Sequence, residues 1–548
     1  MNGAQALLHT LAGCGVTVCF ANPGTSEMYF VAGLDDTPEL RGVLCLYEGV
    51  ATGAADGFGR MTGRPAAVLL HLGPGLANGL ANLHNARRAG TPLLAVIGDH
   101  ASYHKRYDAP LESDIDALAG AVSGWVRHPA RPEDVGADTA DAIAAAMTPP
   151  GQVATLILPA DVSWSEGGAA AQPVPVRSAT PVPGDAIDSA AAVLRSGEPC
   201  VLMLGGAGLW RPGLEAASRI AEATSARLLG ETFPARMERG AGIPAVSRLA
   251  YLAEFAAGQM EGARHLILAG ARPPVTFFAY PALASSMVPA GCDVHVLATP
   301  SDDVAGALAA LADLVAPDTK PVPQQPERPA VPDGELTAQG VAAVIGALLP
   351  EGAIVSDEAN TSGIWLPGAT AGAPPHDWLT LTGGAIGQGL PVATGAALAC
   401  PGRPVLALEG DGSAMYTISA LWSHAREQLD ITTVVFSNRR YAILDMELGR
   451  MTAGAGEAAR SLLDLSRPAI DFTALATGMG VPASRTATVT EFAAQLRTAL
   501  AEPGPHLIEA VVPSVLSPRQ LRAMPYALRA IESLPRPIGA ALKRRLYP

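Results

Sequence analysis

Two residues with oxygen-bearing side chains, Asp411 and Asn438, are separated by a stretch of chain long enough to form one helix and one strand. Asp411 lies in EGDGSAMYT (409–417), directly after the apolar run 405–408, and Asn438 ends the next apolar run, ITTVVFSN. Short apolar runs of this kind are typical of buried strands in parallel sheets, whose carboxyl ends bind ligands in α/β proteins. A carboxylate, an amide oxygen and the carbonyls of the loop NRRY form an all-oxygen set that suits Mg²⁺. We therefore expect a magnesium site at this edge.

The residues around Asp411 also suit an anion. Glycines on both sides of it allow another group to approach the backbone closely. The N–H groups of Ser413 and Ala414 lie at the start of a helix expected over 414–427, where negative groups are favoured. A glycine-rich segment, TGGAIGQGLP (382–391), precedes the same strand. These features predict a diphosphate beside the magnesium; the alternative is that Asp411 only caps the helix.

Two further ionisable residues follow apolar runs. Glu48, in LCLYEGVATGAADGFGRM, precedes a helix crowded with small residues, and the helix dipole alone could explain an acid there. His71 ends the run VLLH before a glycine turn. An imidazole titrates near neutral pH and can move protons in both directions, although a core histidine with satisfied hydrogen bonds is the alternative.

Two proline-rich segments, 166–186 and 316–335, divide the chain and are expected to run as extended connectors. They leave domains over 1–165, 187–315 and 336–530, with a tail over 531–548. In each domain apolar strands alternate with alanine-rich helical segments, which predicts an α/β fold of three doubly wound parallel-sheet domains. The strands are expected at 16–20, 43–46, 67–70, 93–97, 153–158, 200–204, 265–269, 353–356, 405–408, 432–436 and 506–511.

Composition narrows the class of protein. The chain has 548 residues, 49% of them hydrophobic, and a formal charge of −14 without a clustered basic face, which argues against nucleic acid as a partner. The six cysteines show no CxxC spacing and are expected to be reduced, as in cytoplasmic proteins. The sequence contains no signal-peptide pattern and no apolar run long enough to cross a bilayer. We therefore expect a protein that is neither inserted in a membrane nor secreted.

The motifs, taken in order, resemble the thiamine diphosphate-dependent superfamily that includes pyruvate decarboxylase, benzoylformate decarboxylase and acetolactate synthase. GDGS followed by SNRRYAIL is similar to the family's cofactor motif, and the resemblance extends over nearly the whole chain. The other similar segments are NPGTSE (22–27), YEGVATGAADGFGRMTGRPA (47–66), HLGPGLANGLANLHNARRAGTPLL (71–94), GGAIGQGLPVATGAALA (383–399) and TISALW (417–422). The resemblance implies that the first domain binds the cofactor's pyrimidine, that the third domain binds diphosphate and Mg²⁺, and that the middle domain is largely structural.

The resemblance also assigns roles to residues. It places Mg²⁺ on Asp411, Asn438 and the carbonyl of Arg440, the pyrimidine on Glu48, and an apolar support between the cofactor's two rings on Ile386. The implied cofactor-binding residues are Glu48, Gly384, Ile386, Gly410, Asp411, Gly412, Ser413, Asn438, Arg440 and Tyr441. The implied catalytic residues are Glu48, His71 and Thr25, the last of which would contact the substrate carboxylate.

For the activity, the resemblance implies a thiamine diphosphate- and Mg²⁺-dependent decarboxylase or carboligase of 2-oxo acids, similar to benzoylformate decarboxylase. Ala279 stands where that enzyme has a second histidine, and Ile443 hints at small aliphatic substrates. The alternatives are an acetolactate synthase-type carboligase joining two 2-oxo acids, a C–C lyase that releases no CO₂, and a non-catalytic cofactor-binding subunit.

Two further expectations concern ligands and assembly. The turn GGAGLW (205–210) lacks the third glycine of a nucleotide motif because Arg211 stands there, so NAD is not favoured, while FAD is possible but unsupported. Relatives build each site from two chains, which implies a homodimer or homotetramer with sites at subunit interfaces.

Overall fold

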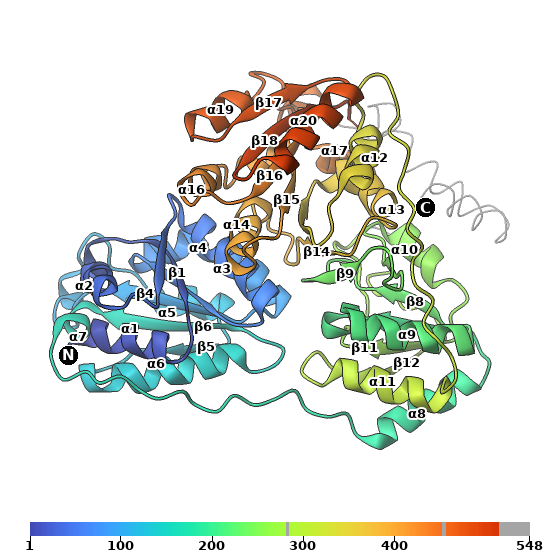
Figure 1. Ribbon diagram of the computed structural model, residues 1–548. Coiled ribbons are helices and arrows are strands. Elements are labelled where there is room, and N and C mark those ends of the chain that lie inside the picture. Colours follow the sequence, from blue (N-terminus) through green and yellow to red (C-terminus); the bar gives the residue numbers. More distant parts are fainter. Residues whose placement is uncertain (281–283, 452–455, 515–548) are drawn as a thin grey trace.

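The computed structural model describes residues 1–280, 284–451 and 456–514, and it contains three sheets covered by helices (Figure 1). All neighbouring strands are parallel except at one edge of the third sheet. The predicted α/β fold with three parallel-sheet units is therefore confirmed. The tail predicted over 531–548 lies outside the described residues, as does 515–530. None of the described helices is long and apolar enough to cross a bilayer.

The first sheet has the strand order β2-β1-β3-β4-β6-β5. Its strands β3, β4 and β6 are buried along their whole length, which explains their nearly continuous apolar sequence. Helices α1 and α6 pack on one face, and α3 and α4 on the other. The strands are β1 (Val18–Asn22), β2 (Arg41–Leu44), β3 (Ala66–Leu70), β4 (Leu93–Asp99), β5 (Trp125–Arg127) and β6 (Val153–Pro159), and these helices are α1 (Gly3–Gly13), α3 (Glu48–Thr62), α4 (Leu72–Ala89) and α6 (Pro132–Met147).

The second sheet has the order β10-β8-β7-β11-β12, with α8, α9 and α11 on one face and α10 on the other. Its elements are β7 (Cys200–Leu204), β8 (Arg227–Gly230), β10 (Ser247–Arg248), β11 (His265–Ala269), β12 (Asp293–Ala298), α8 (Gly184–Arg195), α9 (Arg211–Thr224), α10 (Ala253–Met260) and α11 (Val304–Val315). Arg211 begins α9 and donates from its backbone N–H to Glu238 and from its guanidinium to Glu215.

The third sheet has the order β17-β18-β16-β15-β13-β14-β9. Its last strand, β9 (Met237–Arg239), comes from the second block of sequence and pairs antiparallel with β14. The other strands are β13 (Ile354–Glu358), β14 (His376–Thr380), β15 (Val405–Gly410), β16 (Ile431–Ser437), β17 (Ala483–Thr486) and β18 (His506–Val511). Helices that pack on this sheet include α12 (Ala338–Leu348), α14 (Gly389–Ala399), α16 (Ala420–Arg426), α19 (Phe472–Gly478) and α20 (Val489–Ala501). The second block of sequence therefore contributes one strand to the third sheet. The domain limits drawn from the proline-rich segments stay a prediction.

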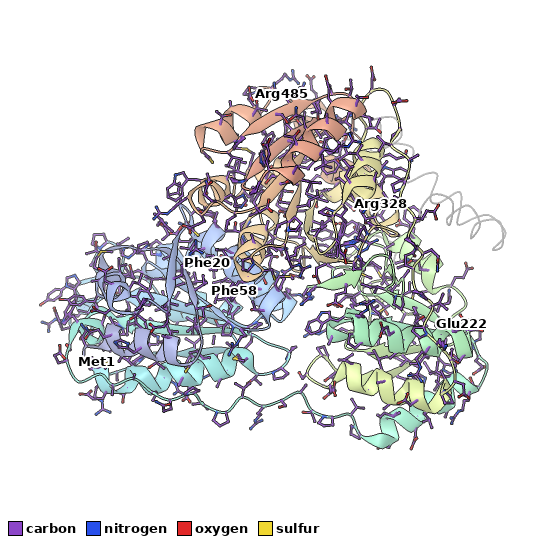
Figure 2. All side chains as sticks on the ribbon, viewed as in Figure 1. Met1, Phe20, Phe58, Glu222, Arg328 and Arg485 are labelled. Carbon is purple, nitrogen blue, oxygen red and sulfur yellow. The ribbon has the colours of Figure 1, made fainter. Side chains whose placement is uncertain are left out.

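The first and third sheets share a hydrophobic core where α3 crosses α14. A Cβ atom on Gly57 would lie 2.1 Å from the carbonyl oxygen of Val392, and one on Gly395 would lie 1.8 Å from that of Ala54. The helices therefore approach at backbone distance, which explains the run of small residues after Glu48. Phe20 and Phe58 belong to the same core and are labelled in Figure 2.

Every strand predicted from an apolar run overlaps an observed strand, but the helix predicted over 414–427 is wrong in its extent. Helix α15 (Asp411–Ala414) ends after one turn, and α16 begins only at Ala420. Between them Thr417 donates from its hydroxyl to the carbonyl of Gly387 at 3.0 Å. The break thus brings the chain after Asp411 against the glycine-rich segment.

Candidate active site

Asp411 begins α15, immediately after β15, and its carboxylate faces the loop that follows β16. One oxygen accepts from the N–H of Gly412 at 2.8 Å and the other from the N–H of Arg439. The side chain is buried, and this burial raises its pKa to about 6 against the opposing effect of the backbone N–H groups. A cation placed at this carboxylate would favour its ionised form, so the residue fits a metal ligand.

Asn438 follows β16, so the predicted pair does meet at one sheet edge. Its amide oxygen accepts from the N–H of Arg440 at 2.9 Å, and its amide nitrogen donates to Ser362 Oγ at 3.3 Å. The chain turns here because Arg439 adopts a left-handed conformation with φ of 57°. The carboxylate, the amide oxygen and the carbonyl of Arg440 therefore lie on facing segments, and their chemistry fits Mg²⁺.

Among the described residues, no three His, Cys, Asp or Glu side chains are close enough to hold a metal ion. The predicted magnesium set includes only one side chain of these types, so it does not depend on such a cluster. Two other predicted residues lie at the same edge. Ser413 Oγ accepts from the side chain of Asn360 at 2.8 Å, and the ring of Tyr441 packs so closely on Gly412 that a Cβ there would lie 2.2 Å from it.

Ile386 lies in a turn between Gly384 and Gly387, whose φ angles of 75° and 93° explain the need for glycine. Its side chain is half-buried. The turn rests on Glu358, whose carboxylate accepts from the N–H groups of Gly387 at 2.9 Å and Gly389 at 2.8 Å.

A second fully buried acid, Glu409, lies beside Glu358 under this turn. Burial raises the pKa of Glu358 to about 7, and burial together with the neighbouring Glu358 raises that of Glu409 well above its ordinary value. The pair therefore retains a proton at neutral pH, because two adjacent carboxylates cannot both ionise in a dry interior.

Glu48 is the first residue of α3 and is 8% exposed. One of its carboxylate oxygens accepts from the amide of Asn78, on α4, at 3.0 Å. The other faces Gly75, where a Cβ atom would lie 3.6 Å away. A largely buried carboxyl at a helix start, in contact with one neutral donor, can bind a further hydrogen-bonding group.

His71 immediately precedes α4, and its Nδ1 lies 2.8 Å from a carboxylate oxygen of Glu27. The same oxygen accepts from the N–H of Gly24 at 2.8 Å. The histidine ring packs directly on Gly24, where a Cβ would lie 2.3 Å from it. Burial raises the pKa of Glu27, and the imidazole opposes this effect. Thr25, in the same loop, is exposed.

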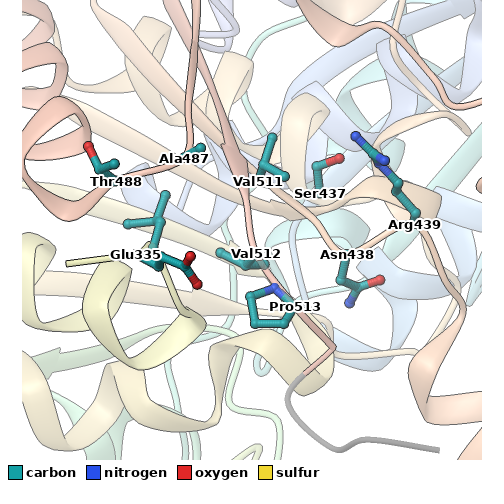
Figure 3. A pocket seen from close by; sticks show the side chains of 10 residues that line it. Glu335, Ser437, Asn438, Arg439, Ala487, Thr488, Val511, Val512 and Pro513 are labelled. Carbon is teal, nitrogen blue, oxygen red and sulfur yellow. The ribbon is translucent and has the colours of Figure 1, made fainter.

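The predicted residues thus form two groups within one chain. Thr25, Glu48 and His71 lie at the first sheet, whereas the glycine-rich turn, Asp411 and the loop 438–441 lie at the third. Beside Asn438 is a pocket of about 490 Å³, shown in Figure 3. It is lined by Glu335, Leu336, Ser437, Asn438, Arg439, Ala487, Thr488, Val511, Val512 and Pro513.

The family models match both groups. Residues 1–119 match the N-terminal thiamine pyrophosphate-binding domain of thiamine pyrophosphate enzymes, and residues 361–510 match the C-terminal one. The chain is 64% identical, over 94% of its length and 100% of the relative's, to a Mycobacterium tuberculosis protein named "Putative acetolactate synthase large subunit IlvX". It belongs to the thiamine pyrophosphate enzyme family.

Other members of this family are similar over the same extent. Benzoylformate decarboxylase of Pseudomonas aeruginosa is 33% identical, covering 90% of this chain and 96% of the relative. The structure of thiamine diphosphate-dependent 4-hydroxybenzoylformate decarboxylase of Rhodococcus jostii RHA1 superposes with a TM-score of 0.81 at 27% identity, covering 94% of this chain and 99% of that one. This thiamine pyrophosphate enzyme is therefore a cofactor-dependent enzyme of 2-oxo acids, as the motifs implied.

Proposed function

We propose that this thiamine pyrophosphate enzyme is a carboligase of the acetolactate synthase type, which joins two 2-oxo acids with loss of CO₂ from one. The 64% identity to the M. tuberculosis relative carries the proposal. The motifs alone favoured a reaction like that of benzoylformate decarboxylase, but the chain is only 33% identical to that relative. The comparison thus favours the alternative.

The segment around Ala279 supports carboligation. Ala279 is exposed and offers no acid–base group where a benzoylformate decarboxylase would carry a histidine. Its neighbours Phe277 and Phe278 are 42% and 52% exposed, and their ring centroids lie 5.0 Å apart. An apolar wall of this kind favours a second organic substrate over a proton donor.

Thiamine diphosphate, when bound, supplies a nucleophilic carbon and accepts the electrons released with CO₂. Asp411, Asn438 and the carbonyl of Arg440 would hold Mg²⁺, and the N–H groups of Ser413 and Ala414 would face the diphosphate.

The remaining groups would act on the rings and the substrate. Ile386 would support the two rings, and Glu48 would hold a proton at the pyrimidine, a role suited to a largely buried carboxyl. Thr25 would contact the substrate carboxylate, and His71, oriented by Glu27, would move protons.

The two groups of residues support a shared site. We propose that the Glu48 group of one chain meets the Asp411 group of another in a homodimer or homotetramer, located in the cytoplasm. Light scattering on the active protein tests this assembly, and a fully active monomer would overturn it.

A plain 2-oxo acid decarboxylase is the second candidate. His71, 2.8 Å from a carboxylate oxygen of Glu27, favours it because an oriented imidazole can protonate a product.

Product analysis separates the candidates. The protein, with Mg²⁺ and thiamine diphosphate, is given pyruvate, 2-oxobutyrate or phenylglyoxylate, and CO₂ and the carbon skeleton of the product are measured separately. A 2-hydroxy-2-alkyl-3-oxo acid with one CO₂ supports the synthase, whereas an aldehyde as sole product supports the decarboxylase. A flavin absorbance band in the purified protein would reveal bound FAD.

A further inference from the structure

We propose that Asn82 and Asn85 are positioning residues, whose amides hold the turn that carries Ile386 against α3 and α4 of the same chain. The inference rests on the proposed cofactor role of Ile386. Both asparagines lie on α4 of the first domain and are 3% and 0% exposed.

Asn85 binds the residue before Ile386 through both halves of its amide. Its Oδ1 accepts from the N–H of Ala385 at 3.2 Å, and its Nδ2 donates to the carbonyl of Ala385 at 2.8 Å. One side chain thereby satisfies both backbone polar groups of Ala385, as a neighbouring strand would. The backbone carbonyl of Asn85 also accepts from the hydroxyl of Thr382 at 2.8 Å.

Asn82 bridges the two domains. Its Nδ2 donates to the carbonyl of Gly49 at 2.8 Å and to that of Gly387 at 3.1 Å. Gly49 follows Glu48, and Gly387 follows Ile386. The Oδ1 of Asn82 accepts from Asn85 Nδ2 at 2.9 Å, which ties the two amides together.

The turn needs such support because its own residues do not fix it. The flanking residues Gly384 and Gly387 are conformationally permissive, and the Ile386 side chain is only half-buried, so side-chain packing holds it on one side only. The orientation of Ile386 therefore depends on the hydrogen bonds of its backbone neighbours. Two buried amides also cost free energy unless they are fully bonded, and these bond almost entirely to the turn, to each other and to the start of α3.

The test uses Asn82→Leu and Asn85→Leu, which keep the side-chain size but remove every amide hydrogen bond. Asn82→Asp and Asn85→Asp, which keep the shape but replace the donor nitrogen by a second carboxyl oxygen, serve if a leucine variant fails to fold. The matched control is Gln259→Leu, because Gln259 in the second domain accepts from the N–H of Ala250 at 2.8 Å and donates to the carbonyl of Arg248 at 3.0 Å. This control removes a comparable amide bridge away from the site.

Three quantities are measured: the calorimetric Kd of thiamine diphosphate with Mg²⁺, the rate of deuterium exchange at the thiazolium carbon of the bound cofactor without substrate, and kcat and KM. We expect exchange and kcat to fall by about 10²-fold in the asparagine variants, as displacements near 1 Å can do. KM should stay near the wild-type value. Gln259→Leu should lower the melting temperature without slowing exchange.

Two results would overturn the inference: asparagine variants that exchange at the wild-type rate, or a Gln259→Leu variant that slows exchange as much as they do. The experiment is separate from the proposed function, because exchange needs only bound cofactor and no choice of acceptor. A wild-type protein that exchanges normally but makes only aldehyde would refute the synthase and leave the positioning role standing. A wild-type protein that does not bind the cofactor would refute both.

Discussion

Arg60 should be one of the most sensitive stability positions in the protein. This α3 residue has a side chain that is 1% exposed, and it forms an ion pair with Asp56, whose side chain is 0% exposed. The guanidinium also donates to the carbonyl of Thr380 at 2.8 Å and that of Ala235 at 3.3 Å, and to Gln388 Oε1 at 3.1 Å. One side chain thus joins the first block of sequence to the second and third.

Arg60→Met removes the charge that compensates Asp56 and leaves buried acceptors without a donor. Breaking a buried ion pair from one side costs about 3–5 kcal/mol, and we expect the free energy of unfolding to fall by this amount. Adding Asp56→Asn removes the uncompensated carboxylate but keeps an oxygen that can accept from the Thr91 hydroxyl. In the wild-type protein Thr91 Oγ1 lies 2.6 Å from Asp56 Oδ1. The double variant should therefore recover at least about 1 kcal/mol relative to Arg60→Met.

The assay is urea unfolding followed by circular dichroism and tryptophan fluorescence, comparing the first transition because a chain of this size need not unfold in two states. The matched control is Arg131→Met, since Arg131 and Asp134 form an ion pair at 3.0 Å on the surface and exposed pairs contribute little. The reasoning is refuted if Arg60→Met is no more destabilising than Arg131→Met, or if adding Asp56→Asn lowers stability further.

Three other predictions concern the site and the core. Glu48→Gln should keep the circular dichroism spectrum and lower kcat by about 10²–10⁴-fold; near wild-type turnover would remove Glu48 from the mechanism. Asp411→Asn should abolish Mg²⁺-dependent cofactor binding in calorimetry, and retained affinity would contradict its role as metal ligand. Burial lowers the pKa of His424 from 6.5 to about 4. Between pH 6.5 and about 4 the unfolded chain therefore binds a proton that the folded protein does not bind. The free energy of unfolding falls as the pH drops through this range, by about 3 kcal/mol in total. His424→Gln should flatten this part of the stability curve, and an unchanged curve would rule out His424 as its source.

The strands that the sequence predicted are those with continuous apolar runs, and those that it missed lack them. Strand β14 reads HDWLT and is buried along its length, but its histidine, aspartate and threonine conceal it. Strand β12 is largely exposed and shows no core pattern. Strand β9 joins a sheet whose other strands lie far away in the sequence, and only the tertiary fold determines that pairing.

The same distinction applies to the site. Asp411 and Asn438 could be predicted to meet because each ends a strand of one sheet. Glu27 ends the motif NPGTSE, but its contact with His71 depends on how two loops fold together. Asn85 and Ala385 meet across 300 residues of sequence, which local patterns do not reveal.

One signal for the asparagines was nevertheless present. Asn78, Asn82 and Asn85 are spaced four and three residues apart, so they share one face of α4. Asn82 and Asn85 are buried there. A stripe of amides on a helix face that also packs in the interior indicates polar partners on a neighbouring domain.

Strand β9, which the second block contributes to the third sheet, limits how this chain can be divided into separate fragments. Excising the middle block at its two proline-rich borders would carry away Met237–Arg239 and leave the backbone of His376–Thr380 without its antiparallel neighbour. An uncovered strand border of this kind invites intermolecular pairing. The remainder, although it holds both cofactor-binding regions, should therefore aggregate, and truncation or domain-swapping experiments must keep this strand with the third block.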